Sequence, residues 1–372
     1  KELVLDVNNS AISNNWTGWA YDSKSYPDSK TKTVTYKLDP EHNLNINTEP
    51  RTATISVSNT FTSEAYTINV TQEAFKFSVD NKSLDNFDEV NASVKRITVE
   101  ECTGNYYDVK IENGNWMKDP AQIGSQWKFE PASDNISTTP RTADIKFVVN
   151  HPAANGIELL SIPVKQNAYV WEVSDPTKTA MPTLGDDVTI SVKSSGSWKV
   201  EAPNGVTPSK KNGAGGKGGV ETSVTLKFEP NYKESPINNI QVKVVCNDNS
   251  DWQKTMTFTQ EAYKFEVKDG NSVVGSSGYE KNIVCEGETF EINVECSDPT
   301  KWDVEYDKSA TWIEAKKSGN NKLVVTVDPN KGSKGTDATE ERRVKLKVKT
   351  TDDSKLTREI NVIQEGYTPS AS

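Results

Sequence analysis

The stretch Pro163-Val-Lys-Gln166-Asn-Ala-Tyr169 decides how the chain is organised, because versions of it return at regular intervals. Each version is a strand-like segment followed by glutamine, a polar residue, a small residue and an aromatic residue. The glutamines are Gln72, Gln166, Gln260 and Gln364, which are spaced 94, 94 and 104 residues apart. A fixed period of about 95 residues indicates a tandem array with one domain per period.

An acidic residue followed by proline marks another position in every period. The four pairs are Asp39-Pro40, Glu130-Pro131, Glu229-Pro230 and Asp328-Pro329. Each pair ends one alternating run and precedes a polar loop and a second run, such as Arg141-Thr-Ala-Asp-Ile145-Lys-Phe147 or Arg343-Val-Lys-Leu346-Lys-Val348. Alternation with a period of two and many β-branched residues is typical of half-buried strands. Proline ends such a strand because it cannot donate to the ladder.

Several short strands therefore fall in each period, and no segment has a convincing helical period. The sequence predicts an all-β fold of four tandem immunoglobulin-like β-sandwich domains in an elongated array. We place the domains at residues 1–75, 76–169, 170–263 and 264–372. Residues 1–6 match the second strand of the later domains, so the first domain lacks its first strand, and we expect the natural N-terminus to lie upstream.

The bulk composition narrows the class of protein. The 372 residues are 34% hydrophobic and 26% charged, with a formal net charge of −10. No run of 18 apolar residues is present, so we expect no transmembrane segment. No basic cluster offers a face for phosphates, so we expect no nucleic-acid partner.

The cysteines and acidic residues do not predict a cofactor. Cys102, Cys246, Cys285 and Cys296 form no CxxC pair, which argues against zinc. We expect free thiols, although a Cys285–Cys296 bridge remains open. The acidic residue beside each repeated proline is interpreted as a turn cap, because an oxygen cage for calcium needs several carboxylates.

No arrangement of residues predicts catalysis. The two histidines, His42 and His151, lie in polar loops with no repeated nucleophile or carboxylate beside them, and we expect both to be solvated. The glycine-rich run Asn212–Gly218 lacks the hydroxyl residue and the following helix of a phosphate-binding loop, so it is interpreted as a mobile hairpin loop. We therefore predict that the protein is not an enzyme.

These repeated features resemble the BACON domain, a family named for its association with Bacteroidetes, its inferred carbohydrate binding and its often N-terminal place. The matching pieces are Trp198-Lys-Val200, Trp302-Asp-Val304, Trp312, Arg51-Thr-Ala-Thr-Ile55, Arg141-Thr-Ala-Asp-Ile145 and the four closing glutamines. Two copies depart from the pattern: Tyr107 replaces the first tryptophan in repeat two, and Asn239 stands where arginine is expected in repeat three. The resemblance implies an extracytoplasmic protein, either periplasmic or lipid-anchored at the outer surface, but it defines no binding residues.

An aromatic cluster near the start is the candidate carbohydrate site. The candidates are Trp16, Trp19, Tyr21 and Tyr26, which neighbouring Asn, Asp and Lys side chains would surround. Aromatic faces stack on sugar rings, and amide and charged groups bond their hydroxyls. Trp198 and Trp302 are expected in the core, and by repeat phase either Trp16 or Trp19 takes that core position.

Two functions of different classes remain open. The first is a non-catalytic surface protein that binds or presents polysaccharide or host glycan. The second is a passive spacer or adhesin stalk, whose activity would lie elsewhere in the protein. A third role, binding of a protein partner at an open edge strand of the first domain, is less favoured.

Overall fold

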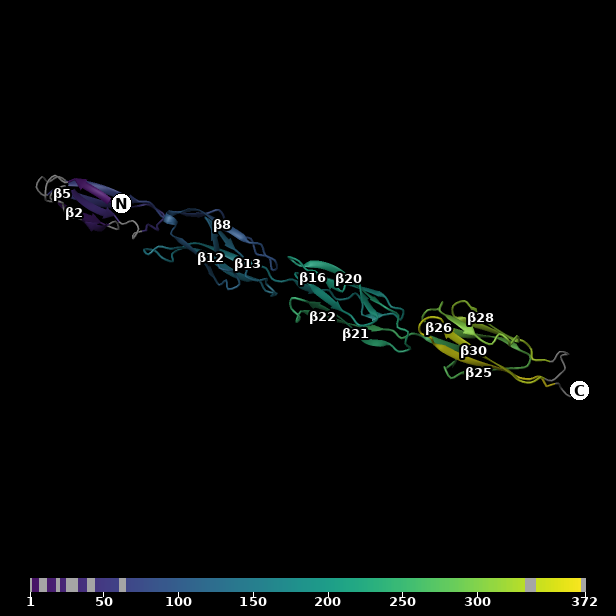
Figure 1. The fold of residues 1–372 in the computed structure, drawn as a ribbon. Helices are drawn as coiled ribbons and strands as arrows, with labels where there is room; N and C mark the ends of the chain where they lie inside the picture. The colour runs from purple at the N-terminus through teal and green to yellow at the C-terminus, as the bar shows by residue number, and fades with distance from the viewer. Residues whose placement is uncertain are drawn as a thin grey trace. The chain divides into compact units, whose positions relative to one another are not determined.

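The computed structural model describes residues 2–6, 12–17, 21–24, 33–38, 44–59, 65–331 and 339–368, and for the strands up to Leu38 the description is limited to the backbone. In these residues every regular element is a β-strand, apart from one 3-10 turn at Thr103–Asn105 (Figure 1). The prediction of an all-β fold built from tandem β-sandwiches is confirmed. Among the described residues no helix is long and apolar enough to cross a membrane.

Strand pairing divides the strands into four consecutive groups, here named repeats one to four. Repeat one holds the sheets β1(Glu2–Asp6)-β4(Thr33–Leu38)-β3(Tyr21–Lys24) and β2(Ile12–Thr17)-β5(Arg51–Asn59)-β6(Ala65–Gln72). Repeat two holds β10(Ala121–Ile123)-β11(Gln126–Phe129)-β8(Lys95–Cys102)-β7(Phe77–Val79) and β13(Glu158–Gln166)-β12(Arg141–Val149)-β9(Tyr107–Glu112). These two repeats belong to one compact unit, residues 1–170 with 216–219.

Repeats three and four belong to the second compact unit, residues 171–215 with 220–372. Repeat three holds β14(Trp171–Val173)-β16(Asp187–Ser194)-β20(Val220–Phe228)-β18(Val206–Pro208) and β15(Ala180–Met181)-β22(Gln253–Gln260)-β21(Ile237–Cys246)-β17(Trp198–Glu201)-β19(Asn212–Gly213). Repeat four holds β24(Ser272–Val273)-β23(Phe265–Asp269)-β26(Glu288–Cys296)-β29(Lys322–Val327)-β28(Ile313–Ser318) and β25(Tyr279–Ile283)-β31(Thr357–Gln364)-β30(Arg342–Thr350)-β27(Trp302–Glu305).

The first described strand takes the second-strand position, as the sequence predicts. Strand β1 pairs antiparallel with β4, and in repeat two the second strand β8 pairs in the same way with β11. The later repeats add a first strand beside the second, as β7 pairs with β8. In the described part of repeat one no strand pairs with the outer edge of β1.

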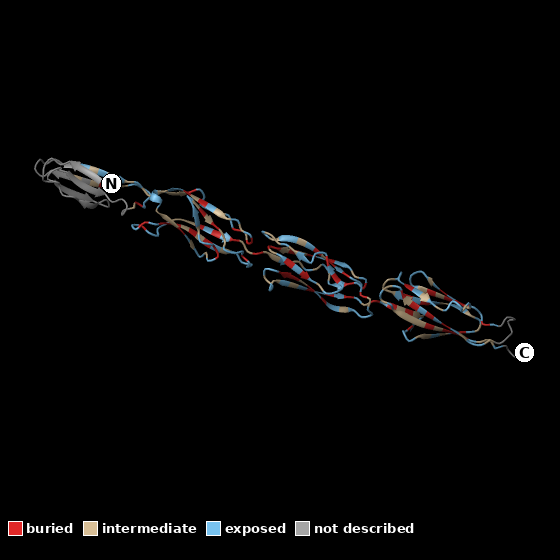
Figure 2. Ribbon diagram, in the orientation of Figure 1, coloured by how far each residue is buried: buried red, intermediate tan, exposed pale blue. Residues whose placement is uncertain are grey.

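Each core forms where the inward faces of two sheets meet. Burial alternates along the strands, as along β16, and the buried residues gather between the sheets of repeats two to four (Figure 2). Phe129, Ile145 and Phe147 are fully buried in repeat two, while Trp198 and Trp302 are 0% and 2% exposed in repeats three and four. The prediction that both tryptophans are core residues is confirmed. Full burial of one such side chain contributes about 2–3 kcal/mol.

The register corrects two positions in the repeated arginine strand. In repeat three a β-bulge between Ile237 and Ile240 puts Ile237 opposite Gln260, so Ile237, and not Asn239, takes the arginine position. Asn239 lies in the bulge with φ of 66°, a conformation that asparagine tolerates better than most residues. In repeat four the residue opposite Gln364 is Arg342, one position before the Arg343 at which the sequence analysis starts this strand.

The structure tests the predictions for the cysteines and for His151. All four cysteines are free, so the Cys285–Cys296 bridge that the sequence left open is not formed. The prediction for His151 is wrong: it is 5% exposed, packs edge-on against Tyr106, and accepts a hydrogen bond at Nδ1 from the Ala153 N–H. His42 lies outside the described residues.

The glycine-rich run is partly a strand. Asn212 and Gly213 form β19, which pairs with β17, so this part of the run is not the free hairpin loop that the sequence predicted. Gly213 lies flat against the indole of Trp198, where an added Cβ would come within 2.1 Å of the ring. Glycine is therefore required by the close approach of backbone to ring.

Candidate functional site

The predicted aromatic site falls largely outside the described residues. Trp19 and Tyr26 are not described, and for Trp16 and Tyr21 only the backbone is. Trp16 lies on β2 opposite Ile55, whereas Tyr21 lies on β3 opposite Leu38. These strands belong to the two different sheets of repeat one. The sugar-binding role of the four aromatics stays a prediction.

The register also shows which residue of repeat one takes the core position of Trp302. Trp302 lies opposite Thr350, eight residues after Arg342 on β30. Eight residues after Arg51 is Asn59, which lies opposite Ile12. Ile12 therefore takes the register position of Trp302, and Trp16 lies four residues further along β2. Sequence phase alone misplaces this strand, because loop lengths differ between repeats. That either Trp16 or Trp19 is a core residue stays a prediction.

The repeated glutamine is a structural residue at the end of each sandwich. Gln166 is fully buried, and its Nε2 donates to the carbonyl oxygens of Asp88 at 2.9 Å and Glu89 at 3.3 Å. Its Oε1 accepts a hydrogen bond of 2.7 Å from Arg141 Nε. Beside it, buried Asn135 donates from Nδ2 to the carbonyls of Thr139 and Asn167, at 3.0 and 2.7 Å.

We call this group of asparagine, glutamine and arginine the closing joint. It recurs in the other repeats with the residues Asn45, Arg51 and Gln72, with Asn231 and Gln260, and with Asn330, Arg342 and Gln364. In every repeat the joint fastens the last strand to the loop after the acidic-Pro pair. Buried carbonyl groups need such partners, since an unpaired one costs about 1–3 kcal/mol.

The arginine of the joint is held by the second tryptophan of the repeat. The guanidinium carbon of Arg141 lies 5.1 Å from the Trp116 ring centroid, and that of Arg342 lies 4.4 Å from that of Trp312. Repeat three has Ile237 at the arginine position, and there Gln260 Nε2 donates to the Glu229 carbonyl at 2.8 Å. The arginine and the tryptophan therefore act as a stacked pair that supports the joint.

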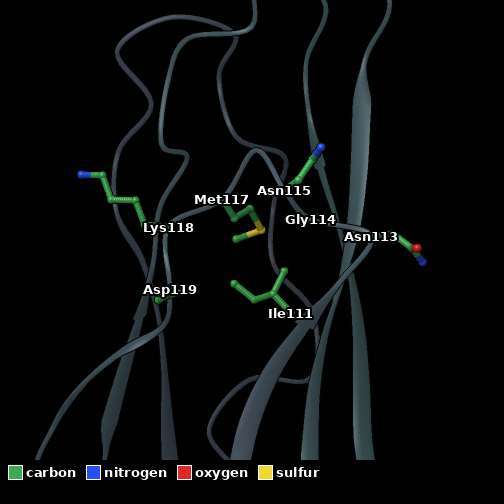
Figure 3. Close-up of a pocket in the computed structure, with 7 residues that line it drawn as sticks. All are labelled: Ile111, Asn113, Gly114, Asn115, Met117, Lys118 and Asp119. Atoms are coloured by element: carbon green, nitrogen blue, oxygen red, sulfur yellow. The ribbon is translucent and has the colours of Figure 1, made fainter.

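A pocket of about 710 Å³ lies at the end of β9 in repeat two. We take it as the candidate binding site. Figure 3 shows Ile111 and Met117 turned toward one another, while Asn113, Asn115 and Lys118 point away from them. Met117 is 7% exposed, so the floor is apolar and buried. The rim therefore carries the amides of Asn113 and Asn115 and the charged side chains of Lys118 and Asp119.

Neighbouring groups fix this rim. Lys118 Nζ lies 2.8 Å from Glu130 Oε1, and the Lys118 backbone N–H donates to the Glu130 carbonyl at 3.1 Å. Gly114 lets the turn approach the sheet, because an added Cβ would come within 2.2 Å of Ile111 Cγ2. The sequence patterns described above do not predict this pocket. The run Asn113-Gly-Asn115 directly after an alternating strand is the signal that could have found it.

Comparisons with known proteins add little to this description. No family model matches the chain, and no curated protein matches it. The chain is similar to extracellular cadherin domains 1–5 of protocadherin gamma B2, with 11% identity over 98% of this chain and 76% of that chain, at a TM-score of 0.27. It is also similar to zebrafish RET cadherin-like domains 1 to 4, with 9% identity over 97% and 94%, at a TM-score of 0.31. Likeness of this size carries no argument on function, and the BACON resemblance stays a prediction.

Proposed function

We propose that the chain is a non-catalytic cell-surface protein that binds or presents glycan through tandem BACON-type β-sandwich repeats. The observation that carries the proposal is the pocket of repeat two, where the amides of Asn113 and Asn115 lie beside the apolar side chains of Ile111 and Met117. A sugar ring presents an apolar face and a rim of hydroxyls, and a pocket that combines apolar and amide groups can contact both. The partner is a polysaccharide or host glycan.

The location is part of the same proposal. The BACON resemblance supports an extracytoplasmic site, at the outer surface or in the periplasm. The opening aromatics, Trp16, Trp19, Tyr21 and Tyr26, remain candidates for a second contact with the same glycan. Weak contacts on several repeats would add through effective concentration.

A titration of tryptophan fluorescence against plant and host polysaccharides tests the proposal. At least one polysaccharide should shift the emission of the full chain, and the Asn113→Gly/Asn115→Ala variant should weaken that response about ten-fold, with glycine at 113 because the backbone there has φ of 56°. The exposed Lys82→Ala variant is the matched control in the same repeat and should bind normally. Trp16→Ala and Trp19→Ala report on the second contact. Absence of binding to every polysaccharide, checked by calorimetry, would overturn the proposal.

The spacer role is the second candidate function, and the closing joint favours it. The same buried hydrogen-bonding group ends every repeat, and only four residues, such as 73–76, separate each closing glutamine from the next strand. Short connections and repeated joints suit a protein that holds something at a distance. Small-angle scattering of residues 1–372 tests this role: an elongated particle supports it, and a compact particle contradicts it.

A further inference from the structure

A second pocket in repeat two lies at the opposite end of β9 from the one in Figure 3. It has a volume of about 530 Å³, within the range of small-molecule sites. Its floor is formed by Val99, Cys102 and Tyr107, which are buried or half-buried. Its rim is exposed and carries the side chains of Glu100, Asn105, Gln122 and Ser125.

Repeat two departs from repeats three and four at one position that lines this pocket. Tyr107 lies opposite Val149, eight residues after Arg141, and therefore takes the place of Trp302. In repeat four the larger Trp302 fills this end of the sandwich and donates from Nε1 to the Asn320 carbonyl at 2.8 Å. In repeat two the tyrosine instead lines the pocket between β8, β9 and the β10–β11 turn.

The hydroxyl of Tyr107 is oriented by two donors. Its oxygen accepts hydrogen bonds from Trp127 Nε1 at 3.2 Å and from Gln122 Nε2 at 3.3 Å. With both acceptor positions used, the phenolic hydrogen must point elsewhere, and it donates to none of the described residues. Gln122 also donates to the Gly124 carbonyl at 3.0 Å, which leaves its Oε1 as an acceptor at the rim.

The remaining rim groups complete a set of mixed donors and acceptors. In the described part of the chain, the side chains of Glu100, Asn105 and Ser125 form no hydrogen bond or ion pair with another residue. Neither lysine nor arginine lines the pocket, so nothing there compensates a phosphate, sulfate or carboxylate ligand. Hydroxyl groups both donate and accept, so a neutral polyhydroxylated ligand fits this set.

The thiol in the floor indicates binding and not catalysis. Burial raises the pKa of the Cys102 thiol to about 11, so the group stays protonated and is a poor nucleophile at neutral pH. It contributes an apolar surface beside Val99. From these contacts we infer that the pocket at Val99–Tyr107 and Gln122–Ser125 is a binding site for one or two residues of a neutral saccharide. This inference rests on the proposed glycan-binding function and names the ligand class and a second site for it.

Calorimetric titration of the full chain with glucose, galactose, mannose, xylose, N-acetylglucosamine, lactose and cellobiose tests the inference. Glucuronate and glucose 6-phosphate serve as anionic probes. We expect at least one neutral sugar to bind and both anions to bind at least ten-fold more weakly. Hydrogen-exchange mass spectrometry should show protection of residues 97–107 and 121–127 with the sugar that binds.

Asn105, Gln122 and Ser125 are exposed, so their replacement should leave the fold intact. Gln122→Ala with Ser125→Ala should weaken binding at least ten-fold, and Asn105→Gly, which keeps its backbone conformation with φ of 56°, should weaken it less. Lys82→Ala, at an exposed position of the same repeat that does not line the pocket, is the control and should bind normally. Sugar binding that survives the Gln122/Ser125 variant but is lost in the Asn113/Asn115 variant would overturn this inference and leave the proposed function standing. Absence of binding to every mono-, di- and polysaccharide would overturn both.

Discussion

A single buried glutamine amide holds several segments together in each of repeats two, three and four. Gln166 on β13 binds the carbonyls of Asp88 and Glu89, in the segment after β7, and accepts from Arg141 on β12. Glutamine can do this because its side chain carries both donors and an acceptor, and no apolar residue of the same size could replace it. These hydrogen bonds explain why a glutamine recurs at the same position in every repeat.

Removal of this amide should destabilise repeat two. Gln166→Ala leaves the Asp88 carbonyl and part of a guanidinium without their partners and removes one of two hydrogen bonds to the Glu89 carbonyl, so we expect a loss of about 2–4 kcal/mol. Hydrogen exchange along β12 and β13 of the full chain measures this locally, which matters because four repeats need not unfold together. The neighbouring exposed Lys165→Ala variant should change little. Equal effects of both variants would contradict the structural role of the joint.

The carboxylate of Asp80 should make repeat two sensitive to acid. The Thr98 backbone N–H donates to Asp80 Oδ1 at 2.8 Å, and this hydrogen bond lowers the pKa of the carboxyl group. A lowered folded pKa contributes stability above the unfolded pKa of about 4, and that stability is lost as the pH falls through the folded pKa.

The effect should be small, because Asp80 is exposed. Hydrogen exchange of β8, compared between pH 5 and pH 3 after correction for intrinsic rates, should show weaker protection at pH 3 in the wild type. Asp80→Asn should reduce this difference, while the exposed Asp85→Asn variant should preserve it. A difference unchanged by Asp80→Asn would rule out this group as the cause.

At the scale of elements, the strands of repeat three depend on a glycine beside a tryptophan. Gly213 on β19 lies against Trp198 on β17, whose indole nitrogen is buried without a hydrogen-bond partner among the described residues. Gly213→Ala should force the ring or β19 to move and cost about 1–3 kcal/mol.

Tryptophan emission and hydrogen exchange of β17 and β21 would report this loss. Gly275→Ala is a suitable control, because the nearest heavy atom to its added Cβ is 3.8 Å away. If Gly213→Ala leaves exchange in β17 unchanged, the close packing of glycine on tryptophan is not required.

The sequence predicted the strands more accurately than it predicted which residues pair across them. Alternation and the closing glutamines indicated the strands, since both follow from local patterns of burial. The bulge at Asn239 and the offset between Arg342 and Arg343 escaped prediction, because register depends on pairing across the sheet. The asparagine of the joint was missed as well, although one follows every acidic-Pro pair within six residues.

The candidate sites were less predictable than the strands. Both pockets of repeat two lie where a loop meets a strand end, and Tyr107 lines the second one. The path of a loop over a strand end cannot be read from a periodic sequence. The opening aromatics stood out by composition alone, and their role is still a prediction.

At the scale of the whole molecule, the central claim is that tandem β-sandwich repeats form a glycan-binding surface protein without catalytic activity. Affinity electrophoresis of the full chain through gels containing single plant or host polysaccharides tests it most directly. We predict retardation by at least one polysaccharide, with no release of reducing sugar during prolonged incubation. Unchanged mobility in every gel would contradict glycan binding and favour the spacer role, and release of reducing sugar would contradict the non-catalytic assignment.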